Sequence, residues 1–183
     1  MNTEVVFLIG FMGAGKSTAG KLLADLTGYS FIDLDAAIEL VAGKSISELF
    51  ESGGEKAFRQ IESDVLRQLE NKSRIVVATG GGCGANPENV DFMNAYGLCI
   101  YLKVQPGVLF HRLAPEKKKR PLLSNLGDVD LMEYILEILP NREVNYRKAS
   151  KIINAEKPAN EVAKEISDLL HYQSFSGRVE RIS

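Results

Sequence analysis

Residues 5–18 read VVFLIGFMGAGKST, an apolar run followed by a glycine loop that ends in a lysine and two hydroxyl residues. The β-branched and aromatic run predicts a strand buried on both faces of a parallel sheet. The loop fits the pattern GxxxxGK[ST], with Gly10, Gly15, Lys16 and Ser17 at its defining positions. Because glycines let a chain fold its N–H groups closely around an anion, this stretch predicts a phosphate-binding loop.

The residues after the loop predict the helix that this motif requires. Apolar side chains recur at helical spacing until Gly28, a residue type typical of helix ends. The start of a helix directs unpaired N–H groups and the positive end of its dipole at the loop. Lys16 would then reach the outer phosphates of a nucleotide, and the Ser17 hydroxyl would ligate Mg²⁺. The alternative, a glycine-rich turn with a solvated lysine, is disfavoured because both flanking elements fit the motif.

Length and composition favour one ordinary α/β domain. The chain has 183 residues, of which 45% are hydrophobic, and a formal net charge of −2, so no global basic field indicates binding to nucleic acid or to an anionic membrane. Cys83 and Cys99 lack metal-ligand spacing and are expected to be free thiols in a reducing compartment. No signal-peptide pattern and no membrane-spanning apolar run occur, which favours a cytoplasmic enzyme.

Strand-like and helical stretches alternate along the chain, which predicts a parallel sheet with helices on both faces. The predicted strands are Val5–Gly10, Ser30–Leu34, Arg74–Ala78, Leu98–Lys103 and Lys151–Asn154. Ser45 and Glu48 form a capping box that opens a short helix, which Gly53-Gly54 should break. A second helix, Asp128–Tyr146, should be interrupted near Pro140.

Two aspartates follow the second predicted strand. Asp33 and Asp35 are two residues apart, so in a strand both would project from one side near its carboxyl end, where ligands of α/β sheets bind. One carboxylate could hold Mg²⁺ through its water shell, and the other could accept a hydrogen bond from a hydroxyl substrate. The alternative, which the sequence leaves equally open, is that one or both cap the next helix.

Arg59 and a run of three glycines are the next candidates. Arg59 has Glu55 and Glu62 at i−4 and i+3, and from this spacing alone a surface ion pair is the favoured interpretation. Gly80, Gly81 and Gly82 follow the third predicted strand. Three consecutive glycines cost chain entropy on folding, so close approach of a ligand to the backbone is favoured over an ordinary loop.

A polar and basic segment, APEKKKRPLLS, lies between Leu113 and Asn125. Its first half has little apolar surface to anchor it, so we expect a mobile lid such as those over phosphoryl-transfer sites. The lysines before Arg120 could be a solvated charge run. Arg120 differs because Pro121-Leu122-Leu123 follows it and could dock when the lid closes.

Taken together, these motifs resemble those of the shikimate kinase family, P-loop enzymes similar to nucleoside monophosphate kinases. The matching motifs are GFMGAGKST at 10–18, FIDLD at 31–35, Phe58-Arg59 with Glu62, TGGG at 79–82, RPLL at 120–123, and Arg142 ahead of Tyr146. They extend over most of residues 5–170. The resemblance implies a three-layer α/β/α fold with a five-stranded parallel sheet, and transfer of the γ-phosphoryl group of ATP to the 3-hydroxyl of shikimate.

The resemblance also implies a role for each candidate residue. The implied catalytic residues are Lys16, Asp35 and Arg120. The implied ATP-binding residues are Gly13, Ala14, Gly15, Lys16, Ser17, Thr18 and Arg120, and the implied shikimate-binding residues are Asp35, Arg59, Gly80, Gly81, Gly82 and Arg142. Ser17 and, through water, Asp33 would hold Mg²⁺. The resemblance reverses the interpretation of Arg59, because a carboxylate substrate needs bidentate guanidinium groups.

The implied partners are ATP, ADP and shikimate, with no nucleic acid and no membrane, for a monomeric cytoplasmic enzyme. One kinase domain is expected over residues 1–170, with substrate-binding helices at about 35–71, a lid at about 113–125 and a loosely ordered tail at 171–183. REVNY at 142–146 lacks the proline and leucine common before the tyrosine in this family, and Arg112 receives no role. The alternatives are a gluconate kinase-like enzyme and a non-catalytic nucleotide-binding module.

Overall fold

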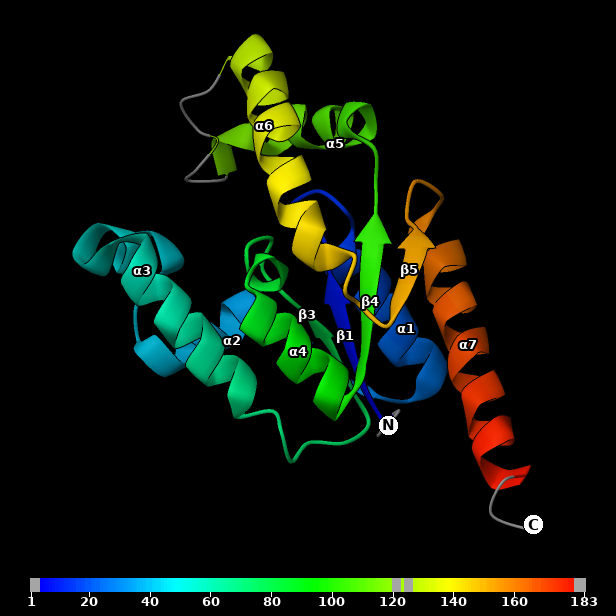
Figure 1. Cartoon of the computed structure of the whole chain (residues 1–183). Helices are drawn as coiled ribbons and strands as arrows, with labels where there is room; N and C mark the ends of the chain where they lie inside the picture. Colours follow the sequence, from blue (N-terminus) through cyan, green and yellow to red (C-terminus); the bar gives the residue numbers. More distant parts are fainter. Residues whose placement is uncertain (1–3, 120–122, 124–126, 180–183) are drawn as a thin grey trace.

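A five-stranded parallel sheet forms the centre of the computed structural model, which describes residues 4–119, 123 and 127–179 (Figure 1). The strand order is β2-β3-β1-β4-β5. The strands are β1 (Val5–Ile9), β2 (Ser30–Asp33), β3 (Ile75–Ala78), β4 (Leu98–Lys103) and β5 (Lys151–Asn154). All five predicted strands are therefore confirmed, and their bounds differ from the prediction by at most one residue.

Helices cover both faces of this sheet. They are α1 (Lys16–Thr27), α2 (Leu34–Ala42), α3 (Ile46–Arg67), α4 (Pro87–Tyr96), α5 (Pro106–Leu113), α6 (Asp128–Tyr146) and α7 (Ala159–Val179), with short 3-10 helices η1 (Cys83–Ala85) and η2 (Ala114–Lys119). Figure 1 shows α4 in front of the sheet and α1 behind it, with α7 packed beside α1. The predicted three-layer α/β/α arrangement is confirmed.

The first strand lies at the middle of the core. It pairs with β3 on one side and with β4 on the other, so that Phe7 faces both Val77 and Cys99 across the ladder. No side chain of β1 is more than 1% exposed, as its continuous apolar sequence predicts. The phosphate-binding loop therefore starts from a buried strand that is paired on both sides.

The capping box and the glycine break in α3 are both confirmed. Ser45 Oγ accepts a hydrogen bond from the Glu48 N–H at 3.3 Å, and the Glu48 carboxylate accepts one from the Ser45 N–H at 2.7 Å. Gly54 breaks the helix with φ 69° and ψ 179°. The break allows Phe50 and Phe58, from the two parts of α3, to pack with ring centroids 4.7 Å apart.

The predicted interruption of α6 near Pro140 is wrong. The helix is continuous from Asp128 to Tyr146, with Pro140 inside it. Pro140 removes the hydrogen bond that would reach the carbonyl of Leu136, but Leu136 is 53% exposed and Pro140 is exposed too. Because solvent can hydrate that carbonyl, the proline does not end the helix.

The segments predicted to form a lid and a C-terminal tail are described only in part. Arg120 and its two following residues lie outside the described part of the chain, whereas Leu123 is fully buried in the core. Helix α7 continues to Val179, into the segment for which the sequence predicts loose order. The division into a kinase domain and a tail stays a prediction.

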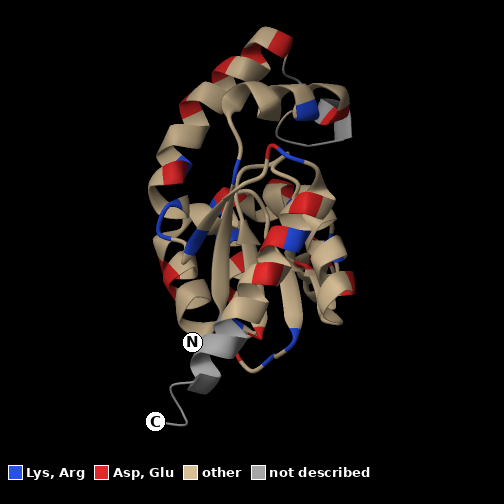
Figure 2. Ribbon diagram, turned by 90° about the vertical axis from the view of Figure 1, so that its right-hand side faces the viewer, with Lys and Arg blue, Asp and Glu red and all other residues tan. Residues whose placement is uncertain are grey.

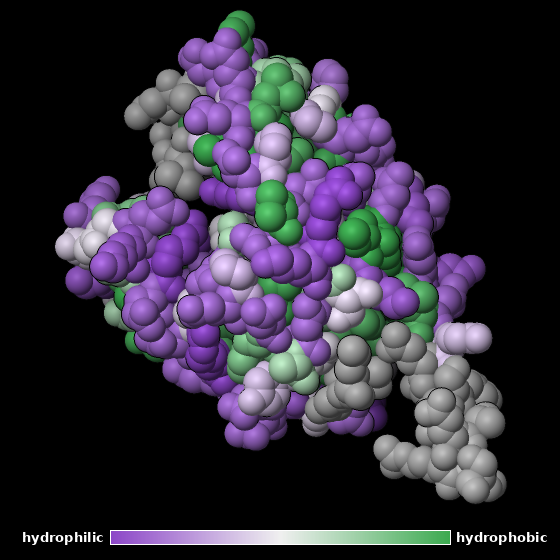
Figure 3. All heavy atoms as spheres, viewed as in Figure 1, coloured by the Kyte–Doolittle hydropathy of each residue, from purple (hydrophilic) through white to green (hydrophobic). Residues whose placement is uncertain are grey.

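The views in Figures 2 and 3 show mixed charge and, on the face in Figure 3, little continuous apolar area. Figure 2 shows Lys and Arg interspersed with Asp and Glu. The face seen in Figure 3 is mostly hydrophilic, with apolar residues in small separate groups. Across the described residues, none of the helices combines the length and the apolar character that crossing a membrane would need.

Candidate active site

The loop between β1 and α1 has the backbone conformation that its glycines predict. Gly15, the N-cap of α1, has φ 88°, and Gly13 has φ 80°. Both values lie in the left-handed region, which favours glycine. A Cβ atom built on Gly13 would also lie 3.0 Å from Cγ of Leu113, so the loop packs closely beneath α5.

Lys16 lies folded over this loop. Its ammonium group donates hydrogen bonds to the carbonyl oxygens of Gly10 at 2.8 Å and Phe11 at 2.9 Å, and the residue is 8% exposed. The backbone therefore holds the ammonium group in the hollow of the loop. A phosphate placed in that hollow would meet the ammonium group and the N–H groups at the start of α1.

Ser17 and Asp33 meet beside the loop. Ser17 Oγ donates a hydrogen bond to Asp33 Oδ2 at 2.9 Å, while Asp33 Oδ1 accepts one from the Asp35 N–H at 3.1 Å and caps α2. Asp33 therefore caps α2, as the second interpretation predicts, and it also faces the phosphate-binding loop through Ser17.

The donor set fits Mg²⁺. The described residues contain no group of three or more His, Cys, Asp and Glu side chains arranged for a metal ion. Mg²⁺ does not need such a cage, because it keeps several waters and usually takes one or two protein oxygens with substrate phosphates. The hydroxyl of Ser17 and the carboxylate of Asp33 supply that pair.

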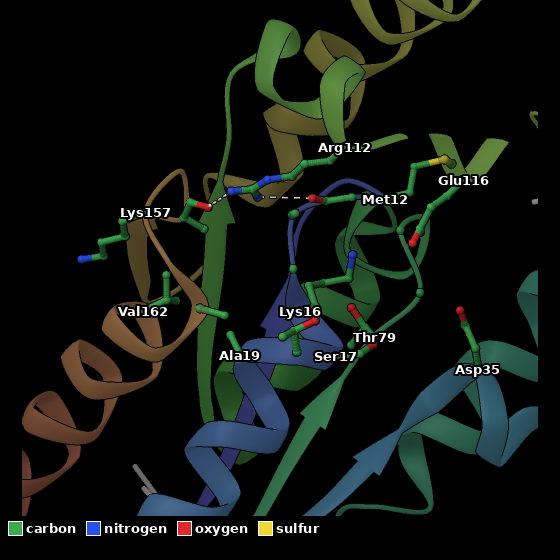
Figure 4. A pocket seen from close by; sticks show the side chains of 18 residues that line it. Met12, Lys16, Ser17, Ala19, Asp35, Thr79, Arg112, Glu116, Lys157 and Val162 are labelled. Atoms are coloured by element: carbon green, nitrogen blue, oxygen red, sulfur yellow. Dashed lines mark hydrogen bonds between the residues drawn. The ribbon is translucent and has the colours of Figure 1, made fainter. Parts of the chain in front are cut away.

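A cavity of about 460 Å³ adjoins the loop (Figure 4). The loop and the start of α1 form its floor, with Ala14 and Thr18 among the lining residues. Lys157 lies on one side, near the start of α7, and Asp35 lies on the opposite side. Gly80 and Gly81 also line it, so one continuous cavity joins the loop to the triple-glycine segment.

Arg112 is a site residue to which the sequence assigned no role. Its guanidinium group donates hydrogen bonds to the carbonyl oxygens of Ala155 at 3.0 Å, Glu156 at 3.3 Å and Gly13 at 3.4 Å (Figure 4). It thus links α5, the phosphate-binding loop and the loop between β5 and α7. The acceptors are main-chain carbonyls, which every residue has, so no pattern of residue types in the sequence predicts these contacts.

Each glycine of the 80–82 segment makes room for a different group of the site. A Cβ atom on Gly80 would lie 2.5 Å from Asp35 Oδ1, one on Gly81 would lie 3.0 Å from the Met12 nitrogen, and one on Gly82 would overlap the Arg59 guanidinium group. All three glycines are described and none has a positive φ. Space rather than backbone strain therefore requires glycine here.

Arg59 makes both ion pairs that its spacing predicts, but only one lies at the surface. The guanidinium group lies 3.1 Å from Glu55, which is exposed, and 2.9 Å from Glu62, which is fully buried. Burial raises the pKa of the Glu62 carboxyl, and the charge of Arg59 opposes this shift. The prediction of a surface ion pair is therefore correct for Glu55 and wrong for Glu62. The buried Glu62 carboxylate holds Arg59 beside Gly82.

Arg142 reaches the same glycine segment from α6. Its Nη1 donates a hydrogen bond to the Gly81 carbonyl at 3.3 Å, and its guanidinium carbon lies 5.4 Å from the centre of the Phe11 ring. Phe11, a loop residue that the sequence analysis did not single out, thus supports an arginine of the site. Arg59 and Arg142 both approach the triple glycine, and the positive charge of each opposes the burial that raises the pKa of Glu62.

Asp35 lines the cavity next to Gly80, on the side opposite Lys157. Burial raises the pKa of its carboxyl, and the nearby Asp33 raises it further, whereas Lys16 and Arg59 lower it. A carboxylate with a raised pKa accepts a proton or a hydrogen bond from a hydroxyl group more readily. Of the candidate residues, Gly13–Thr18, Asp35, Gly80 and Gly81 line this cavity. Asp33 lies beside the phosphate-binding loop, and Arg59, Gly82 and Arg142 belong to or contact the triple-glycine segment, but these four are not among the lining residues. Arg120 lies outside the described residues.

Comparison with known proteins gives consistent matches. The family model described as shikimate kinase matches residues 12–171. The shikimate kinase of Parabacteroides distasonis is 44% identical over 85% of this chain and 90% of its own length, and that of Phocaeicola vulgatus is 42% identical over 83% and 87%. More than two thirds of each relative is therefore covered.

Solved structures of shikimate kinases are also similar to this chain. A shikimate kinase from Bacteroides thetaiotaomicron superposes with a TM-score of 0.87 at 37% identity, covering 91% of this chain and 98% of that one. A shikimate kinase from Acinetobacter baumannii in complex with shikimate gives 0.82 at 34% identity, covering 93% and 94%. A gluconokinase from Sinorhizobium meliloti gives 0.58 at 18% identity, which shows a shared fold alone.

Proposed function

Because the chain belongs to the shikimate kinase family, we propose that it transfers the γ-phosphoryl group of ATP to the 3-hydroxyl of shikimate, giving shikimate 3-phosphate and ADP. One observation carries this proposal: Arg59 and Arg142 approach the same triple-glycine segment, next to Asp35. Shikimate carries a carboxylate and ring hydroxyls. Two guanidinium groups bind a carboxylate in the bidentate manner that ammonium cannot offer.

The nucleotide half of the site would hold the phosphates through main-chain N–H groups. These come from the loop residues Gly13–Thr18, with Lys16 adding a positive charge and Arg112 bordering the same cavity. Ser17 and Asp33 would hold Mg²⁺, Asp33 through a water molecule. When bound, Mg²⁺ supplies positive charge to the phosphate oxygens.

Asp35 would orient the acceptor hydroxyl. In the reaction, a bond forms between the 3-oxygen and the γ-phosphorus, the bond from that phosphorus to the bridging oxygen of ADP breaks, and the hydroxyl proton passes to Asp35 or to solvent. A loose phosphoryl transition state demands positioning more than proton removal. The proximity of Asp35 to Gly80 supports this positioning role.

Arg120 has a proposed role that comes from the sequence alone. It lies outside the described residues, so its proposed place over the transferring phosphoryl group rests on its position in the RPLL motif. Cys83 and Cys99 are free and buried, which suits a cytoplasmic enzyme. We also propose that the enzyme is a monomer.

An assay of ADP release tests the acceptor. The protein is incubated with Mg·ATP and shikimate, gluconate or no acceptor, and ADP is measured through a coupled oxidation of NADH. We expect ADP formation to depend on shikimate, with gluconate close to the acceptor-free rate. Equal rates with shikimate and without acceptor would contradict the proposal, and a rate that rises only with gluconate would favour the carbohydrate-acid kinase alternative.

A further inference from the structure

The last turn of α6 donates three side-chain hydrogen bonds to one short segment of backbone. Tyr146 Oη and Arg142 Nη1 both donate to the Gly81 carbonyl, the latter at 3.3 Å. Asn145 Nδ2 donates to the Ala85 carbonyl at 2.7 Å. The 81–85 segment, between β3 and α4, is therefore tied at two points to the helix that carries Arg142.

Tyr146 is built firmly into this contact. The residue is fully buried, its ring centre lies 5.1 Å from that of Tyr101, and a Cβ atom on Gly84 would lie 3.1 Å from its Cδ1. Burial raises the pKa of Tyr146 to about 12, so its hydroxyl keeps its proton and stays a donor at any usual assay pH. The Gly81 carbonyl thus has a permanent partner beside the guanidinium group of Arg142.

The same glycine also lies against the phosphate-binding loop. Its backbone approaches so closely that a Cβ atom on Gly81 would lie 3.0 Å from the Met12 nitrogen. Gly81 is therefore held between the nucleotide loop on one side and the end of α6 on the other. A shift of this peptide would move the anchor of Arg142 relative to the nucleotide phosphates.

We infer that Tyr146 and Asn145 are positioning residues for the acceptor, which fix the 81–85 segment and thereby hold Arg142 in place for the acceptor carboxylate. This inference rests on the proposed function and extends it to two residues to which the resemblance assigns no role. Neither needs to touch the substrate. Their effect should therefore appear in the use of a negatively charged acceptor and be absent for ATP.

Tyr146→Phe removes one hydroxyl and leaves the ring packing in place. We expect the KM for shikimate to rise about tenfold, the order of one lost buried hydrogen bond, with the KM for Mg·ATP within twofold of the original value. Asn145→Ala, at a half-buried position, should act in the same direction by a smaller factor. Asn141→Ala is the matched control, because the Asn141 amide is exposed and bonds the Glu137 carbonyl of its own helix rather than the 81–85 segment.

A neutral acceptor distinguishes a misplaced Arg142 from a general loss of activity in the variant. With the carboxamide analogue of shikimate, Arg142 has no carboxylate to bind, so the unmodified enzyme and Tyr146→Phe should differ by less than twofold in kcat/KM. An equal loss with both acceptors, an unchanged KM for shikimate in both variants, or an equal rise in the KM for Mg·ATP would overturn the inference. Failure of the unmodified enzyme to use shikimate at all would instead overturn the proposed function.

Discussion

The carboxyl group of Asp35 lies between a second carboxylate, Asp33, and two cations, Lys16 and Arg59. Its pKa is raised because burial outweighs the attraction of the cations. Such a group can aim a hydroxyl and also take its proton as the bond to phosphorus forms. The two roles can be separated by a substitution that keeps the shape of the side chain.

Asp35→Asn keeps a hydrogen-bond acceptor but cannot take a proton. We expect kcat to fall by about 10² to 10³, the range of general-base and positioning effects, with the KM for Mg·ATP unchanged. Steady-state kinetics with each substrate varied in turn measure both constants. Unchanged turnover would remove Asp35 from the mechanism, and a selective rise in the KM for Mg·ATP would move it to the nucleotide half of the site.

The raised pKa of Asp35 also predicts how stability depends on pH. A raised carboxyl pKa means that the folded state binds the proton more tightly than the unfolded state, so ionised Asp35 lowers the free energy of unfolding at neutral pH. This penalty disappears as the pH falls through the raised pKa. Asp35→Asn should therefore be more stable than the original chain at about pH 7.5, and the difference should shrink at about pH 4.5.

Urea unfolding at the two pH values measures this difference. The slope of the transition should be the same for both proteins, because the exposed surface does not change. A less stable Asn variant at the higher pH, or a stability difference that is the same at both pH values, would contradict the raised pKa.

Arg59 shows where prediction from sequence ends at the residue scale. Its spacing from Glu55 and Glu62 correctly indicates two ion pairs. Spacing cannot show that Glu62 is fully buried, because its burial depends on contact between α3 and a glycine segment that follows β3. Because of that contact, Arg59 pairs with a buried carboxylate, and its guanidinium group is held in one place.

The triple-glycine segment is continuous in sequence, but each of its glycines has a different neighbour in the site. Gly82 has an ordinary φ of −94°, so alanine suits its backbone, but a Cβ atom would push the Arg59 guanidinium group aside. Gly81 lies instead against the backbone of Met12 in the phosphate-binding loop. A flexible side chain can move away from an added methyl group, whereas backbone cannot.

Gly82→Ala should therefore impair only the acceptor half of the site. We expect the KM for shikimate to rise by about tenfold or more, as a displaced charged partner predicts, with the KM for Mg·ATP within twofold. Gly81→Ala should raise both KM values, because it displaces the nucleotide loop as well. Identical kinetic effects of the two substitutions would show that the segment does not divide in this way.

Two breaker residues show what local sequence can and cannot predict at the scale of a helix. Gly54 ends a helical segment as predicted, because its left-handed φ suits glycine alone. Pro140 does not, because the carbonyl it leaves without a partner belongs to an exposed residue. The difference lies in tertiary packing, which the sequence around a proline does not reveal.

At the scale of the whole molecule, the fold was predictable because the three central strands, β1, β3 and β4, are compact apolar runs that alternate with helical stretches. The sheet order and the approach of Arg59 and Arg142 to one glycine segment were not predictable from the residues alone, because they depend on crossovers between strands distant in sequence. Arg112, Asn145 and Tyr146 bond mainly to main-chain carbonyls, which leave no pattern of partner residues to find.

Removal of the C-terminal segment tests the proposed extent of the kinase domain. The buried face of α7 includes Val162, Ile166 and Leu170, all within residues 1–170. A chain that ends after Tyr172 should keep its shikimate-dependent kcat within twofold and unfold in one cooperative thermal transition. Loss of activity without loss of the folded state would show that the removed residues take part in the site.

The central claim is that a carboxylate held by Arg59 and Arg142 places the acceptor hydroxyl at Asp35, beside the nucleotide loop. A crystal structure with shikimate and Mg·ADP bound tests it most directly. We predict carboxylate oxygens at about 3 Å from both guanidinium groups and a ring hydroxyl at the same distance from Asp35. A carboxylate bound away from either arginine, or a ring that turns no hydroxyl toward Asp35, would contradict it.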